Sequence, residues 1–116
     1  MLSNSSLETL FTKARSQNGW LNKGITDEQI HQLYDLLKFG PTSANCCPAR
    51  FTFIRTKEAK ERLKPYLDSG NINKSMSAPA VAIISYDIDF YQKLPYLFPH
   101  TNAKFWYEGK EQKIKF

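Results

Sequence analysis

The sequence lacks the features that define several large protein classes. Its longest clearly apolar run, residues 80–84, is far too short to span a bilayer, and no basic segment followed by an apolar stretch marks a secretory signal at the N-terminus. Its only two cysteines, Cys46 and Cys47, are adjacent, so they cannot easily form an unstrained disulfide or supply a zinc site alone. We therefore expect a cytoplasmic protein with free thiols, no metal site and no membrane contact.

A concentrated basic patch is also missing, although the formal net charge is +5. Lysines and arginines are scattered singly, often beside Glu or Asp, and only Lys110, Lys113 and Lys115 lie close together. An excess of positive charge suits an anionic partner such as nucleic acid, a nucleotide or a phosphate-bearing cofactor. A small nucleic-acid-binding module has only this charge in its favour, since no basic and aromatic residues cluster as such modules require. Most of the charge is better interpreted as a solvated surface, and we expect no nucleic-acid partner.

The chain is long enough for one domain with a core of its own. It has 116 residues, of which 41% are hydrophobic and 14% aromatic, and this composition argues against disorder. We expect residues 1–116 to form a single domain. We find no internal repeat and no low-complexity stretch.

Hydrophobic periodicity and capping signals predict a mixture of helices and strands. Ser5 lies three residues before Glu8, which predicts a helix from there to about Arg15. Thr26 and Gln29 give a second start signal for a helix that Gly40 stops. The further expected elements are a strand at 51–55, a helix at 57–67 interrupted by Pro65, a short helix at 71–77, a strand at 80–86 and a helix at 87–97 that Pro95 ends or kinks. Two expectations concern burial: the second helix buries a stripe of Ile30, Leu33, Tyr34 and Leu37, and the second strand is covered on both faces.

The most informative stretch is the loop at residues 40–50, which reads GPTSANCCPAR. It follows a helix and leads into a strand, and its small hydroxyl and amide side chains have little to bury. Such a loop can bring backbone groups and an amide against a flat polar ligand, although most loops only connect elements.

This loop resembles the Pro-Ser/Thr-Ser-x-Asn-x-x-Pro element of the nitroreductase family of flavin enzymes. The resemblance runs from about Leu7 to Gly109, and further motifs lie at residues 14–20, 59–65, 86–87 and 97–101. Together they are similar to the malonic semialdehyde reductase (RutE-like) branch. The resemblance implies an α+β fold with a mixed sheet flanked by helices, built as a homodimer, with FMN as cofactor and NADH or NADPH as co-substrate. Members normally continue beyond the point where this chain stops, so a C-terminally truncated, partial domain is expected.

The resemblance also assigns cofactor-binding residues. Arg15 takes the place of an arginine on the FMN phosphate, where a guanidinium offers a bidentate fork, and Ser16 and Gln17 follow within reach of ribityl or phosphate oxygens. The competing interpretation of Arg15 is a solvated residue at a helix end. The residues matched to the ring-binding element are Pro41, Thr42, Ser43 and Asn45. Asn45 can donate and accept along the edge of the isoalloxazine ring, or simply form a loop hydrogen bond of the Asx type.

Several positions depart from the family pattern. Gln17 stands where relatives often have Ser, Gly19 where they have a basic residue, Cys47 where many have Gln, and Ala49 where many have Trp. The first two departures weaken the case for phosphate binding, and the branch itself departs from the wider family at the last two.

The resemblance implies an oxidoreductase that transfers hydride from NAD(P)H through FMN to a small acceptor. The acceptor is malonic semialdehyde, which gives 3-hydroxypropionate, or a similar aldehyde, nitro compound or quinone. Because the protein positions and shields the flavin, no catalytic residue is assigned, and His100 is better interpreted as a structural loop residue. The alternative is a truncated, non-enzymatic remnant that cannot hold FMN alone.

Overall fold

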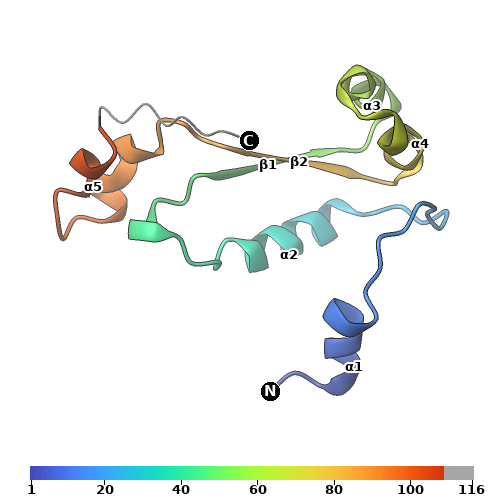
Figure 1. The fold of residues 1–116 in the computed structure, drawn as a ribbon, viewed down its shortest axis with the longest axis horizontal. Coiled ribbons are helices and arrows are strands. Elements are labelled where there is room, and N and C mark those ends of the chain that lie inside the picture. Colours follow the sequence, from blue (N-terminus) through green and yellow to red (C-terminus); the bar gives the residue numbers. More distant parts are fainter. Residues whose placement is uncertain (109–116) are drawn as a thin grey trace. The chain divides into compact units, whose positions relative to one another are not determined.

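A computed structural model describes residues 1–108, which form two compact units. The first combines Met1–Gly24 with Arg55–Val81, and the second combines Ile25–Ile54 with the described residues from Ala82 onward. The helices are α1 (Asn4–Leu7), α2 (Asp27–Leu37), α3 (Lys57–Leu63), α4 (Ser69–Ser77) and α5 (Leu94–Leu97), and the strands are β1 (Ala49–Ile54) and β2 (Val81–Tyr86), all labelled in Figure 1. Helices combined with a two-stranded antiparallel sheet confirm the predicted α+β class.

The N-cap of the first helix lies two residues before the predicted one. Ser3, not Ser5, is the N-cap, because the Ser3 Oγ accepts a hydrogen bond from the Ser6 backbone N–H at 3.1 Å. After Leu7 the helix widens into a π-helical turn that ends at Thr12, three residues short of the predicted end. Three serines, Ser3, Ser5 and Ser6, lie close together near the N-terminus, so the capping pattern alone did not identify which of them is the cap.

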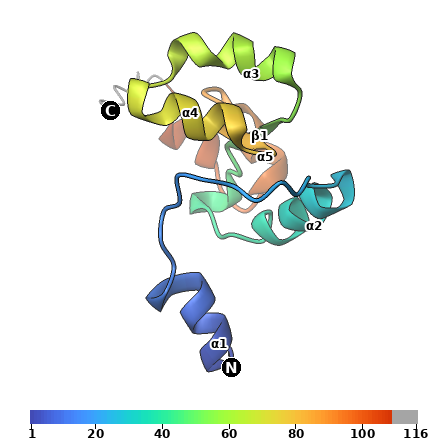
Figure 2. The same ribbon diagram turned by 90° about the vertical axis from the view of Figure 1, so that its right-hand side faces the viewer.

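The predicted interruption at Pro65 is present in the first unit. The Thr56 hydroxyl caps α3 by accepting from the Ala59 N–H at 3.2 Å, and the helix ends at Leu63. A new 3₁₀ turn over Lys64–Tyr66 then begins with Pro65 in its first positions, where a missing N–H costs nothing. Helix α4 follows and lies beside α3 (Figure 2).

A buried lysine joins α3 to the end of α4. Lys60 is 8% exposed, and its ammonium donates to the carbonyl oxygens of Met76, at 3.5 Å, and of Ala78. These carbonyls lie where α4 ends and have no partner in the next turn of helix. Lys60 therefore supplies a hydrogen-bond donor to carbonyl oxygens at the end of α4 that have none within the helix.

The second unit begins with the predicted capping box. The Thr26 hydroxyl accepts from the Gln29 backbone N–H at 3.2 Å, and the Gln29 side-chain Oε1 accepts from the Thr26 backbone N–H at 3.0 Å. The buried stripe predicted for α2 was wrong, since Leu33, Tyr34 and Leu37 are all more than 40% exposed. Among residues 1–108, no helix is both long and apolar enough to cross a membrane.

The sheet pairs the start of β1 with the end of β2. Strands β1 and β2 run in opposite directions (Figure 1). The Asp87 N–H, just after β2, donates to the Pro48 carbonyl just before β1 at 2.9 Å, and this hydrogen bond sets the register. The expectation that the second strand is covered on both faces was wrong, because Ile84 is 71% exposed. An apolar run predicts a strand correctly, but the layers that cover it come from tertiary structure.

The best-packed cluster of the second unit lies at the end of the sheet where the 40–50 loop enters. It contains Cys46, Phe90, Leu94 and Ala103, of which Leu94 is fully buried. Pro95 does not end a helix here; it occupies the first turn of α5, where proline is tolerated. The cluster thus joins the loop to the segment that follows β2.

Candidate functional site

The loop that carries the predicted ring-binding residues has an unusual backbone. Residues Ser43–Asn45 form a single 3₁₀ turn. The φ angles of Ala44, Asn45 and Cys47 are 49°, 49° and 41°, in the left-handed region that favours glycine. Asparagine adopts this conformation readily, whereas alanine and cysteine bear a penalty of about 1–2 kcal/mol each. Surrounding contacts must hold this conformation in place.

Thr42 supplies two of these contacts from the start of the loop. Its carbonyl oxygen accepts from the Asn45 N–H at 3.1 Å, and its Oγ1 accepts from the Cys47 N–H at 3.1 Å. The Thr42 hydroxyl thus accepts the Cys47 N–H in place of the backbone carbonyl that would accept it in a regular turn. Thr42 therefore holds Asn45 through its backbone and Cys47 through its side chain.

Asn45 uses both ends of its amide within the second unit. Its Nδ2 donates to the carbonyl oxygen of Leu97 at 3.1 Å, and its Oδ1 accepts from the Cys47 thiol at 3.3 Å. These bonds give the amide a structural role and fix its plane. An amide has two N–H donors and two acceptor lone pairs, so one of each remains for a ligand.

The other loop residues differ in their anchoring. The Ser43 hydroxyl lies 3.4 Å from the Tyr107 hydroxyl, whereas Pro41 is exposed. Cys46 is buried in the cluster beside Leu94, and Cys47 is exposed; both thiols are free. Within residues 1–108, no three metal-ligating side chains come together.

The residues predicted to bind phosphate belong to the first unit. Arg15, Ser16 and Gln17 lie on an exposed stretch after the first helix. The Arg15 Nη1 donates to the nearby carbonyl oxygens of Ala14 at 2.7 Å and Thr12 at 3.3 Å. The structure thus brings residues 41–45 together as one loop, and residues 15–17 form a separate exposed segment.

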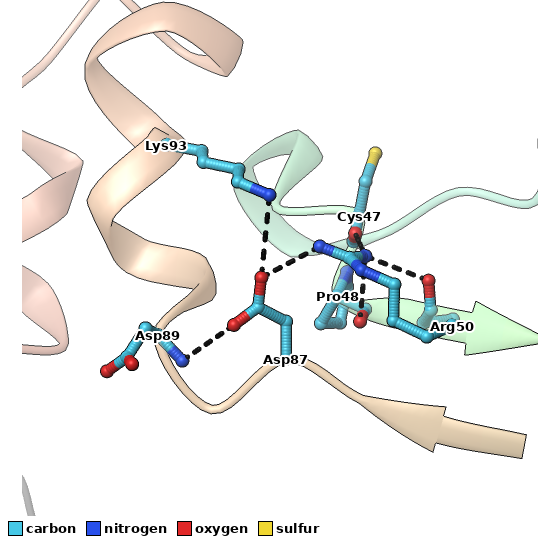
Figure 3. Close-up of polar contacts among 7 residues, drawn as sticks. Cys47, Pro48, Arg50, Asp87, Asp89 and Lys93 are labelled. Carbon is cyan, nitrogen blue, oxygen red and sulfur yellow. Dashed lines mark hydrogen bonds and ion pairs between the residues drawn. The ribbon is translucent and has the colours of Figure 1, made fainter.

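An arginine that the sequence did not single out lies at the exit of the loop (Figure 3). The Arg50 Nη2 donates to the Asp87 Oδ2 at 2.8 Å, and its Nη1 points at the backbone carbonyls that precede it. Lys93 lies 3.5 Å from the same carboxylate oxygen. The pairing could have been anticipated, because Arg50 lies near the start of one strand and Asp87 follows the end of its antiparallel neighbour.

The environment of Asp87 favours its charged form. A hydrogen bond from the Asp89 N–H to Oδ1, at 3.0 Å, lowers the pKa of the Asp87 carboxyl, with smaller contributions in the same direction from Lys93 and Arg50. Partial burial opposes these effects but does not reverse them.

Asp87 is therefore expected to make stability fall in acid. A carboxyl whose folded pKa is lowered stabilises the fold above its unfolded pKa, about 3.9, and that contribution is lost as the pH falls through the folded value. Urea unfolding from pH 7 to pH 2 should show a midpoint that drops below about pH 4. Asp87→Asn should be less stable than wild type at pH 7 and lose part of this acid dependence. Asp68→Asn is the control, since Asp68 is exposed and its side chain makes no capping hydrogen bond to α4. Equal acid profiles in wild type and Asp87→Asn would contradict the prediction.

Comparison with known proteins finds a relative for almost the whole chain. No protein-family model matches the chain. A protein of Cupriavidus pinatubonensis with the provisional name NADH dehydrogenase/NAD(P)H nitroreductase is 54% identical over 113 residues, which cover 97% of this chain. The chain spans 58% of the length of that relative. This similarity supports the assignment of the chain to the nitroreductase family.

Proposed function

We propose that this chain forms the FMN-binding portion of an NAD(P)H-dependent oxidoreductase. Its acceptor is malonic semialdehyde, reduced to 3-hydroxypropionate, or a similar small aldehyde, nitro compound or quinone. The name of the relative supports the NAD(P)H oxidoreductase class. The family motifs at residues 40–50 and 97–101 favour the malonic semialdehyde branch.

The observation that carries the proposal is the strained loop of the second unit. Backbone strain is commonly retained where the chain must approach a ligand closely, because a relaxed conformation would not present the same groups. Here three non-glycine residues, Ala44, Asn45 and Cys47, are left-handed, and Asn45 is the residue matched to the flavin ring. Its fixed amide plane keeps one donor and one acceptor direction available for the ring edge.

The donor chemistry of the predicted residues fits FMN. A phosphate needs cations or N–H donors, and the exposed Arg15 guanidinium makes its described hydrogen bonds through Nη1 alone, which leaves Nη2 for phosphate oxygens. Ser16 and Gln17 add polar groups suited to the ribityl chain. FMN, when bound, supplies the hydride-accepting and hydride-donating chemistry. The residues of this chain then bind the phosphate, orient the ring and shield it from water.

The proposal includes a cytoplasmic homodimer. Free thiols suit a reducing compartment. Large apolar side chains of the second unit are exposed in the single chain, including Leu36 at 76%, Phe39 at 79% and Ile84 at 71%. Exposed apolar surface of this kind favours association.

The first test compares FMN with riboflavin, which has the same ring but no phosphate. The purified chain is incubated with either flavin, free flavin is removed, and stoichiometry and dissociation constants follow from the visible spectrum and flavin fluorescence. Arg15→Gln should weaken FMN binding by about tenfold to a hundredfold, because it removes charge-assisted hydrogen bonds, and leave riboflavin binding nearly unchanged. Asn45→Ala should weaken both flavins by about tenfold. Asn22→Ala, an exposed asparagine, is the matched control.

The outcomes separate the enzyme from its alternative. Stoichiometric flavin with this variant pattern supports the proposal, and assays with NADH and malonic semialdehyde then define the acceptor. A folded but colourless protein overturns cofactor binding by this chain and favours the non-enzymatic remnant. Flavin binding that Arg15→Gln leaves intact would remove Arg15 from the site.

A further inference from the structure

The Arg50 side chain gathers three consecutive carbonyl groups at the exit of the loop. Its Nη1 lies 3.1 Å from the Cys47 carbonyl oxygen, 3.1 Å from that of Pro48 and 2.9 Å from that of Ala49. Figure 3 shows these oxygens and the Asp87 carboxylate converging on one guanidinium. A cation shared by several carbonyls fixes the peptide planes that carry them, because each plane must keep its oxygen turned toward the charge.

The Arg50 guanidinium is itself held in place by the sheet and by the turn that follows β2. Arg50 is the second residue of β1, and Asp87 follows β2, so the antiparallel register places them at the same end of the sheet. The Asp87 carboxylate is itself oriented by the Asp89 N–H at 3.0 Å and by Lys93 at 3.5 Å. The side chains of Arg50 and Asp87 are 42% and 25% exposed, which limits screening by water without abolishing it.

The pair of Arg50 and Asp87 matters because the strained residue Cys47 lies just before Arg50 in the chain. Cys47 has a φ of 41°, an unfavourable value for a residue with a Cβ, and its carbonyl is one of the three that Arg50 holds. The Cys47 N–H is held from the other side by Thr42 Oγ1. The peptide groups on both sides of the strained residue are therefore fixed, one by Thr42 and the other by Arg50.

We propose that Arg50, braced by Asp87, is a positioning residue for the cofactor loop. It keeps residue 47 in the left-handed conformation, and this conformation places the Cys47 thiol against the Asn45 Oδ1 and fixes the amide plane. Arg50 thus acts on flavin through Asn45, without contact of its own. The inference rests on the proposed function for its effect on flavin, whereas its effect on the loop stands independently.

The test separates loop positioning from general stability by using Arg50→Gln, Arg50→Lys and Arg62→Gln. Arg62→Gln is the matched control, since Arg62 is exposed on α3. Two probes need no flavin: site-resolved alkylation of the buried Cys46 thiol, and amide hydrogen exchange at Cys47 compared with Thr52 in β1, whose N–H faces β2 in this register. Arg50→Gln should accelerate Cys46 alkylation and Cys47 amide exchange by about tenfold, with a smaller change at Thr52, because a charged hydrogen-bond network at the loop is lost. Arg50→Lys should rescue these rates in part, since one ammonium can pair with Asp87 but lacks the second arm of the fork.

Flavin binding provides the remaining readout. If wild type binds flavin, Arg50→Gln should weaken FMN and riboflavin equally, by about tenfold, as expected of a residue that acts through Asn45. Equal acceleration at Cys47 and Thr52 would show a general loss of stability and overturn the proposal, as would unchanged loop probes. If wild type binds no flavin, the proposed function fails while alkylation and exchange still decide whether Arg50 holds the loop.

Discussion

Leu94→Ala is expected to lower the free energy of unfolding by about 2–5 kcal/mol, the range for truncating a fully buried leucine. Leu94 is the one described large side chain with no exposed surface, and it packs with Cys46, Phe90 and Ala103. The cost includes the lost burial of the side chain and the cavity that remains. Because Cys46 belongs to the loop, the substitution should also loosen the candidate cofactor site.

Urea unfolding followed by near-ultraviolet circular dichroism would measure this effect. The ring contact between Phe90 and Tyr107, with centroids 4.9 Å apart, makes the aromatic signal sensitive to packing of the cluster. Leu36→Ala removes the same atoms from a side chain that is 76% exposed, so its effect should stay within about 0.5 kcal/mol. Equal effects of the two substitutions would show that the cluster is not the stabilising centre of the second unit.

Lys60→Met should destabilise the first unit by about 1–3 kcal/mol, because it leaves buried carbonyl groups without a donor. Methionine keeps an unbranched apolar stem, so packing along the side chain is largely retained. The carbonyl oxygens of Met76 and Ala78 lose the ammonium, and Ala78 is only 4% exposed, so water cannot easily replace it. Part of this loss is offset, because methionine carries no charge and so avoids the desolvation penalty of a buried ammonium.

Tryptophan fluorescence can report on the first unit alone. In a Trp106→Phe background only Trp20 remains, and its Nε1 donates to the Lys74 carbonyl oxygen in α4 at 2.8 Å. Lys57→Met is the control, because Lys57 is exposed at the start of the same helix. A Lys60→Met variant as stable as wild type would mean that the buried carbonyls tolerate the loss of their donor.

Local signals in the sequence were sufficient to predict most elements. The Thr26 capping box and the break at Pro65 depend on neighbouring residues alone, and each is present. Burial was predicted less well, because the layers that cover a helix stripe or a strand are set by distant parts of a structure. Leu33 and Ile84 are therefore exposed despite their helical and strand patterns.

In the candidate site, too, the local features could be predicted from the sequence and the long-range contacts could not. The loop and its Asn45 were identifiable from the order of residues, because a family motif is a local pattern. The partners that hold the loop, Leu97 and Tyr107, lie 52 and 64 residues away, and no spacing rule joins them to it. The pairing of Arg50 with Asp87 lies between these cases, since it follows from strand register once both strands are known.

The left-handed residues of the loop limit which sequences can occupy it. A β-branched residue at 44, 45 or 47 would bring its second γ-substituent against the adjoining carbonyl, whereas glycine, asparagine and aspartate would fit the backbone at little cost. Glycine, however, would allow the loop many more conformations in the unfolded chain. Sequence libraries of this loop would therefore retain more folded members if they varied Ser43, whose φ angle is not left-handed, kept the Thr42 hydroxyl that holds the Cys47 N–H, and allowed only glycine, asparagine, aspartate or the native residue at positions 44, 45 and 47.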